Sequence, residues 1–157
     1  MIKKSKKGFT IIELIVVIAI IAVLAGIVLI NVTGYINKGR DAAAQGNLAS
    51  MLTNGAVFYD ANSSFTNFIT VASPVAAGAA ATCTGNAGFV GPCQAITGTS
   101  ATTGYQLSFT CAGTSCTVGA TGWCAIITLK SGNTYCVDSN GNKLNKSGGT
   151  CAAGVCS

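Results

Sequence analysis

The sequence contains no histidine, few charged residues and only two prolines. Histidine is the commonest general base and the commonest metal ligand, so its absence removes the usual basis for both kinds of site. Only 8% of the residues are charged, whereas a typical soluble protein has about 25%. Outside the apolar N-terminal segment the only acids are Asp41, Asp60 and Asp138, and they offer no acid–base pair. We therefore expect no enzyme activity, no cofactor and no metal site.

The net charge of +5 is concentrated at the N-terminus. Lys3, Lys4, Lys6 and Lys7 supply four of the nine cations, and the rest of the chain has no run of lysine or arginine. The body of the chain therefore shows no nucleic-acid-binding surface. We interpret residues 1–8 as a basic leader that stays on the cytoplasmic side of a membrane.

An apolar segment covers residues 9–30 and is interrupted only by Thr10 and Glu13. The 17 residues from Leu14 to Ile30 contain no polar side chain. As a helix these residues rise about 26 Å, close to the ~30 Å thickness of a hydrocarbon core. Because lysines precede the segment and few cations follow it, the positive-inside rule places the N-terminus in the cytoplasm. We expect a single membrane-spanning helix, with the remainder of the chain facing outward.

Residues 31–61 are expected to continue this helix as an amphipathic half, because apolar residues recur at three- and four-residue spacing. Lys38, Arg40 and Asp41 are among the residues assigned to the polar side. The residues of the apolar side are Ile36, Ala44, Leu48, Met51, Leu52, Val57, Phe58 and Tyr59. At its start this half has four poor helix formers, for which we predict a flexible joint in an assembled form. They are Asn31, Val32, Thr33 and Gly34.

The C-terminal part changes character. Residues 62–104 are rich in Ala, Gly, Thr and Ser and contain both prolines, and we interpret them as a cysteine-containing connecting loop. Residues 105–157 contain short strand-like runs, and Asn140-Gly141 is a strong hairpin signal. Alternation from Trp123 to Leu129 predicts one apolar face that packs on the amphipathic helix. The predicted fold class is α+β, a long N-terminal helix packed on a small disulfide-bonded antiparallel sheet.

All eight cysteines lie in the second half of the chain. An even number in a polar, glycine-rich, outward-facing region predicts a disulfide framework. The spacings Cys111-x4-Cys116 and Cys151-x4-Cys156 could also suggest a zinc site with four thiolates, but export favours disulfides. The sequence does not assign the pairing, apart from a weak preference for near neighbours. The eight residues are Cys83, Cys93, Cys111, Cys116, Cys124, Cys136, Cys151 and Cys156.

Asp138-Ser139-Asn140-Gly141-Asn142 places oxygen-bearing side chains at alternate positions, as the start of a calcium-binding loop does. The glycine is at the wrong position for that motif, and no acidic residue closes the loop. We therefore interpret this segment as a hairpin turn.

The most informative stretch is Gly8-Phe9-Thr10-Ile11-Ile12-Glu13-Leu14. An ordinary secretory signal is cleaved after its apolar run, whereas no suitable site ends this run and a carboxylate lies inside it. An acidic residue at the centre of a membrane helix costs about 2.5–3.5 kcal/mol, and somewhat less near one end. Because no cation lies within helical reach on the apolar side, we expect Glu13 to pair with another chain or with an N-terminus.

The same stretch resembles the processing motif of type IV prepilins and of their relatives, the pseudopilins of type II secretion. The resemblance implies cleavage between Gly8 and Phe9 by a peptidase that faces the cytoplasm, followed by N-methylation of Phe9. It also implies that Glu13 pairs with the Phe9 amine of a neighbouring subunit. The likeness is close over about 25 residues and loose beyond them. Many family members have a proline in the second half of the apolar run, and this chain has none.

The resulting expectation is a structural pilin that begins as a single-pass precursor in the cytoplasmic membrane and assembles into an extracellular type IV pilus. The implied partners are further copies of the chain, prepilin peptidase, the pilus assembly machinery in the cytoplasmic membrane, and membrane lipid. Adhesion, motility, DNA uptake or protein secretion would be properties of the filament. One alternative is a pseudopilin in a periplasmic pseudopilus, and another is a membrane-anchored surface protein that never polymerises.

Overall fold

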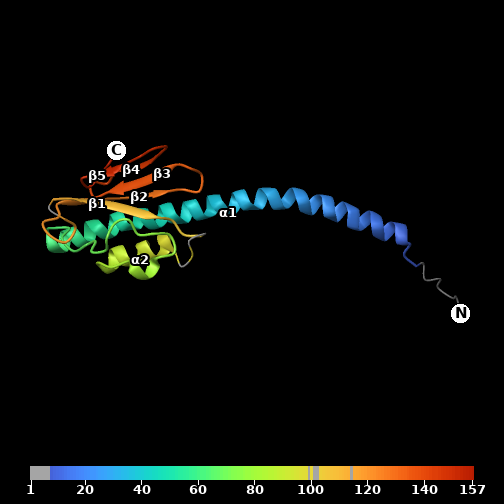
Figure 1. Cartoon of the computed structure of the whole chain (residues 1–157), viewed down its shortest axis with the longest axis horizontal. Coiled ribbons are helices and arrows are strands. Elements are labelled where there is room, and N and C mark those ends of the chain that lie inside the picture. The colour runs from blue at the N-terminus through green and yellow to red at the C-terminus, as the bar shows by residue number, and fades with distance from the viewer. Residues whose placement is uncertain (1–7, 99, 101–102, 114) are drawn as a thin grey trace. The chain divides into compact units, whose positions relative to one another are not determined.

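The computed structural model describes residues 8–98, 100, 103–113 and 115–157. The chain divides into two compact units, residues 1–37 and 38–157. Helix α1 (Ile11–Asn62, 52 residues) contributes to both units and contains no proline (Figure 1). It is continuous through Asn31, Thr33 and Gly34 in the single chain. The joint predicted there concerns an assembled form, so it stays a prediction.

In the first unit, the described part of α1 exposes its side chains almost throughout. Every side chain that the structure describes from Phe9 to Val28 is exposed, although nearly all of them are apolar. Within the described residues, α1 is the one helix whose length and composition allow it to cross a membrane. The apolar surface is therefore available to lipid or to another chain.

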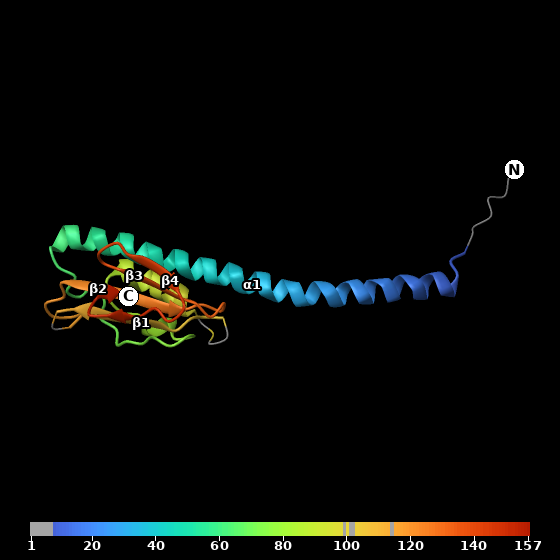
Figure 2. The same cartoon turned by 90° about the horizontal axis from the view of Figure 1, so that it is seen from above.

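The second unit contains a four-stranded antiparallel sheet in the order β1-β2-β3-β4. Figures 1 and 2 show its strands along the second part of α1. The strands are β1 (Leu107–Ala112), β2 (Gly122–Thr128), β3 (Thr134–Asp138) and β4 (Lys143–Lys146). A separate two-stranded hairpin is formed by β5 (Cys151–Ala152) and β6 (Val155–Cys156). The predicted α+β class, with a long N-terminal helix and a small antiparallel sheet, is confirmed.

One face of the sheet packs on the second part of α1, as the alternation predicted. Trp123, Ala125, Ile127 and Leu129 are all buried, and they share one core cluster with Ala44, Leu48 and Met51 of α1. Gly55 provides the closest approach, because a Cβ atom there would lie 2.8 Å from Cζ2 of Trp123. The core therefore depends on a residue without a side chain at this point of the helix.

Two details of the amphipathic half differ from the prediction. Ile36, Val57 and Tyr59 were assigned to the apolar side but are 47%, 67% and 46% exposed. Asp41 was assigned to the polar side but is only 5% exposed. Its carboxylate accepts hydrogen bonds from the Tyr105 hydroxyl and from backbone N–H groups of the β2–β3 turn, so burial leaves it fully paired.

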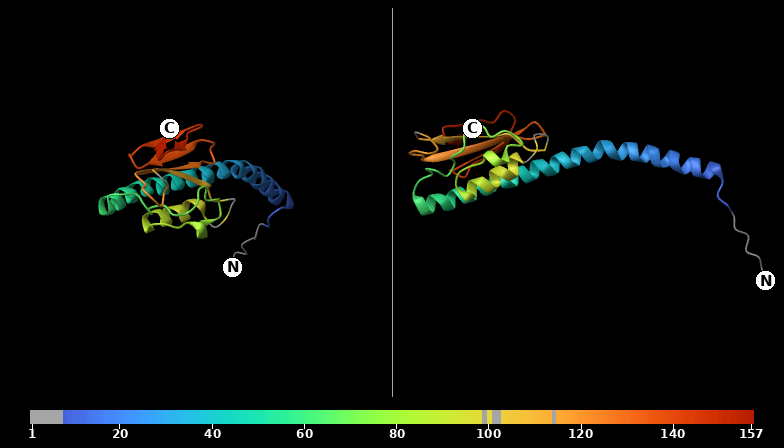
Figure 3. Two further views of the ribbon diagram at one scale, coloured as in Figure 1. Left: turned by 60° about the vertical axis from the view of Figure 1, so that its left-hand side comes forward. Right: turned by 60° about the horizontal axis from the view of Figure 1, so that its bottom comes forward.

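The segment predicted as a connecting loop contains a helix that the sequence analysis missed, α2 (Ala87–Thr97), after a short 3-10 turn (Ala80–Thr82). Pro92 lies inside α2 and cannot donate to the Gly88 carbonyl, the usual partner one turn earlier. The Asn54 side-chain amide of α1 donates to that carbonyl instead, at 2.9 Å. Asn86 caps the start of the helix by accepting from the Gly88 N–H. A contact between distant parts of the chain thus stabilises this helix, which lies beside β1 (Figure 3).

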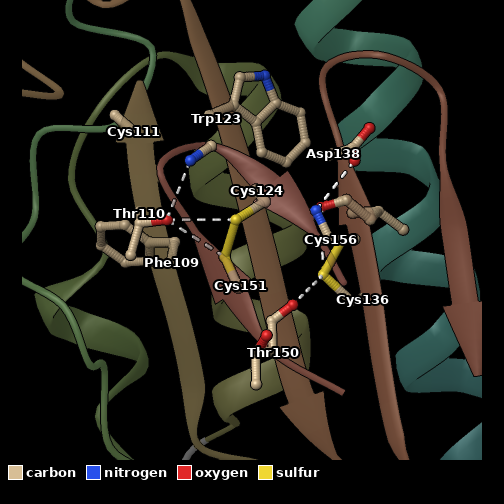
Figure 4. Close-up of a disulfide and its surroundings, with 12 residues drawn as sticks. Phe109, Thr110, Cys111, Trp123, Cys124, Cys136, Asp138, Thr150, Cys151 and Cys156 are labelled. Carbon is tan, nitrogen blue, oxygen red and sulfur yellow. Dashed lines mark hydrogen bonds between the residues drawn. A yellow bond between two sulfur atoms is a disulfide. The ribbon is translucent and has the colours of Figure 1, made fainter. Parts of the chain in front are cut away.

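All eight cysteines form disulfides: Cys83–Cys93, Cys111–Cys116, Cys124–Cys151 and Cys136–Cys156. The preference for near neighbours holds for the first two pairs. It is wrong for Cys151 and Cys156, which pair with β2 and β3 rather than with each other. These two bonds hold the β5–β6 hairpin against the face of the sheet opposite α1 (Figure 4). A small second cluster on that face includes Ile126 and Leu144.

The segment that resembled a calcium-binding loop is a hairpin turn. Oδ1 of Asp138 accepts from the backbone N–H groups of Asn140 and Asn142, at 3.0 and 3.1 Å. Oδ2 accepts from the Asn142 side chain and from the Cys156 N–H, at 2.9 and 3.1 Å. The carboxylate therefore joins the β3–β4 turn to the last strand, and the hairpin interpretation is confirmed.

Candidate processing and assembly site

The predicted scissile bond lies in accessible, non-helical backbone. Residues 8–10 precede α1, and among the described residues no atom beyond the adjacent residues lies within 4 Å of the position that a Cβ atom on Gly8 would occupy. The Phe9 side chain is 78% exposed. A peptidase needs a reachable substrate segment, and Gly8 and Phe9 are exposed and non-helical directly before the helix begins.

Thr10 and Glu13 form a capping box at the start of α1. The Glu13 N–H donates to Oγ1 of Thr10 at 3.4 Å, and the Thr10 N–H donates to Oε2 of Glu13 at 2.8 Å. The Thr10 hydroxyl also donates to Oε2, at 2.6 Å. Such reciprocal bonds satisfy N–H groups that have no partner within the helix and define where it starts.

The sequence predicts that Glu13 has its partner outside its own chain, but the capping box gives it a partner within the chain. Glu13 has two donors three residues earlier in the same chain. The pattern Thr-x-x-Glu before an apolar run was a local signal for this arrangement. A carboxylate in the first turn is also stabilised by the positive end of the helix dipole. The charge is therefore partly satisfied before any other subunit arrives.

Exposed apolar side chains lie beside Glu13 on one side of the helix. They are Phe9, Ile12, Val16 and Val17. About two turns further along, Ile20, Val23 and Leu24 are exposed as well. An exposed apolar surface with one carboxylate suits an apolar helix that brings a cation to it.

The sequence comparison is decisive for this segment. Residues 3–29 match the prokaryotic N-terminal methylation motif. This motif is the class III signal peptide of type IV prepilins, and the matched residues include Gly8, Phe9 and Glu13. No curated protein and no solved structure matches the chain.

The methylation motif implies processing by prepilin peptidase and handling by pilus assembly machinery. It supports a type IV pilin-like or pseudopilin-like protein, and proteins with this motif are structural rather than enzymatic. The apolar helix agrees with membrane anchoring. The match ends at residue 29, so it does not extend to the joint residues Asn31, Thr33 and Gly34 or to the cysteines.

Proposed function

We propose that this chain is a structural subunit of a type IV pilus. The observation that carries the proposal is the methylation motif, which is joined directly to an apolar helix whose described side chains from Phe9 to Val28 are all exposed. Prepilin peptidase cleaves the Gly8–Phe9 bond, Phe9 is methylated, and the mature chain waits in the cytoplasmic membrane before it enters an extracellular filament.

Assembly exchanges contacts with lipid for contacts with other subunits. Because lipid tails are as apolar as the helix itself, association depends on close van der Waals packing and on polar contacts between helices. The apolar side chains of the helix provide the packing surface. Glu13 provides the polar contact, because it lies among the exposed apolar side chains of Phe9, Ile12, Val16 and Val17.

We propose that Glu13 pairs with the Phe9 amine of a neighbouring subunit. Opposite charges a few ångströms apart attract more strongly in a low-dielectric surrounding than in water. The Phe9 amine is free only after cleavage, so the pairing would make assembly depend on processing. It would also fix the axial offset between subunits, because one offset brings an amine to each carboxylate.

The disulfide-bonded sheet unit would form the filament surface. A pseudopilin shares the same motif and would form a shorter filament in the periplasm, which is the principal alternative. A membrane-anchored protein that does not polymerise is a second alternative. Adhesion, motility or secretion would follow from what the filament surface binds.

Shearing of intact cells distinguishes these possibilities. The sheared material is examined by electron microscopy and by intact-mass measurement of its subunits. The pilin proposal predicts filaments composed of this chain, with a methylated Phe9 as first residue. A chain that remains with the cells indicates a pseudopilin or an anchor. Filament subunits that begin at Met1 would refute the processing step.

A further inference from the structure

The two carboxylate oxygens of Glu13 are in different environments. Oε2 accepts both hydrogen bonds from Thr10, at 2.8 Å from the backbone N–H and at 2.6 Å from the hydroxyl. In the part of the chain that the structure describes, no group donates to Oε1. The capping box therefore occupies one oxygen and leaves the other available.

We propose that Thr10 is a positioning residue for assembly: it holds the Glu13 carboxylate through Oε2, so that Oε1 can accept the amine of a neighbouring subunit. The proposal rests on the pilin function above. A free glutamate side chain has many rotamers, and ordering it during association costs entropy. The capping box already orders it in the single chain, which favours pairing.

The hydrogen bonds from Thr10 to Glu13 also stabilise the single subunit in the membrane before assembly. A carboxylate without donors is unfavourable in an apolar surrounding, and Glu13 lies at the start of the apolar helix. Two donors from Thr10 lower that cost while the subunit has no neighbour. The amine of the neighbouring subunit then binds Oε1 of Glu13, and the hydrogen bonds from Thr10 to Oε2 remain in place.

The hydroxyl of Thr10 is the group to test, because the backbone N–H is present whatever residue occupies position 10, except proline. The hydroxyl makes the shorter bond to Oε2 and also accepts from the Glu13 N–H. Thr10→Val keeps the shape and removes both interactions. Thr10→Ser keeps the hydroxyl and is the matched control.

Each variant is produced together with the wild-type chain, and mass spectrometry measures its share in sheared filaments relative to its share of mature chain in the membrane. We expect Thr10→Ser to incorporate like wild type. We expect Thr10→Val to incorporate about twofold to thirtyfold less, the range that loss of an N-cap side chain produces. Equal incorporation of the two variants would overturn the proposal. If the valine chain is not cleaved, Thr10→Ala takes its place with the same expectation.

Glu13→Gln separates this inference from the proposed function. Glutamine can complete a capping box but carries no charge. Normal incorporation of Glu13→Gln would refute the charge pairing itself, whereas poor incorporation combined with normal Thr10→Val would refute only the role of Thr10. In the Glu13→Gln background, Thr10→Val should cause no further loss. A further loss of the same size would show that Thr10 acts on the helix and not through Glu13.

Discussion

The Tyr105 hydroxyl donates a 2.7 Å hydrogen bond to Oδ1 of Asp41, which joins the chain before β1 to the second part of α1. The backbone N–H groups of Lys130 and Ser131 donate to the same carboxylate, at 2.8 and 3.1 Å. Three segments that are distant in sequence therefore meet at one buried charge. The Lys130 ammonium lies 5.0 Å from the centre of the Tyr105 ring, which adds a cation–π contact.

We predict that the buried Asp41 carboxylate makes the stability of the fold sensitive to acid. Burial by itself would raise the pKa of Asp41, but the hydrogen bonds from Tyr105, Lys130 and Ser131 outweigh it and hold the pKa below its usual value. A carboxyl whose pKa is lower in the folded state stabilises the fold above its unfolded pKa of about 3.9. That stabilisation is lost as the pH falls through the folded pKa. We therefore expect the free energy of unfolding to decrease below about pH 4.

Asp41→Asn should weaken this acid dependence and lower the free energy of unfolding at pH 7 by about 1–3 kcal/mol, because an amide replaces a charged acceptor. Urea unfolding of the full chain in detergent, followed by fluorescence of its single tryptophan, measures both effects. Asp60→Asn is the control, since Asp60 is an exposed carboxylate on the same helix. An unchanged acid dependence in Asp41→Asn would show that other groups control it, and Asp138 would be the first candidate because its pKa is also lowered.

We predict that a side chain at position 55 would disturb the packing of the core. A Cβ atom at this position would lie 2.8 Å from Cζ2 of Trp123, closer than van der Waals contact allows. Gly55→Ala should therefore destabilise the second unit by about 1–3 kcal/mol through overpacking. Gly46→Ala is the matched control, because among the described residues no atom outside the local helix backbone lies within 4 Å of its Cβ position.

Alanine at position 46 causes no clash and has a higher helix propensity than glycine. Gly46→Ala should therefore raise the free energy of unfolding by up to about 1 kcal/mol. The same urea unfolding measurement applies to both variants. If Gly55→Ala is as stable as Gly46→Ala, the close packing of Trp123 on α1 is wrong.

The disulfides differ in the length of chain that they close. Chain entropy gives about 3–4 kcal/mol for Cys124–Cys151, whose residues are 27 apart, and about 2 kcal/mol for Cys111–Cys116, 5 apart. Replacing the first pair by alanine should therefore lower stability more than replacing the second. Peptide mapping without reduction should recover all four connections. A Cys151–Cys156 peptide would contradict the placement of the β5–β6 hairpin.

The joint concerns the assembled state. Asn31, Thr33 and Gly34 are helical in the single chain. We predict that the helix loosens there in a filament, because backbone groups outside lipid can bond to water or to neighbouring subunits. A density map of the filament tests this directly. Unbroken helix through Gly34 would show that poor intrinsic propensity does not decide the conformation.

Local patterns predicted the long helix and the sheet because their signals are periodic and need no knowledge of distant residues. The failures arise where a distant residue decides the outcome. Helix α2 was missed because Pro92 and its neighbouring glycines disfavour a helix, whereas Asn54 satisfies the carbonyl that Pro92 cannot. Asp41 was assigned to the polar side because a carboxylate is normally exposed, and its three donors come from segments that only the fold brings together.

The residues of the candidate site, in contrast, are recognisable from local sequence alone. Gly8, Phe9 and Glu13 were identified from local sequence, and the methylation motif covers all three. The capping box is also visible in the sequence as Thr-x-x-Glu, because the donors that Glu13 uses are the neutral groups of Thr10 and not a cation. The partners of Cys151 and Cys156 could not be predicted, because they depend on where the β5–β6 hairpin lies on the sheet.

Glu13→Ala shows whether Glu13 acts between chains during assembly. Membrane insertion, cleavage after Gly8 and sheared filaments are measured in the same cells. We predict that the variant is inserted and processed at least as well as wild type, because a charge has been removed from the apolar helix. We also predict that surface filaments are absent or severely reduced. Normal numbers of filaments composed of the alanine variant would contradict the account and show that apolar packing alone suffices.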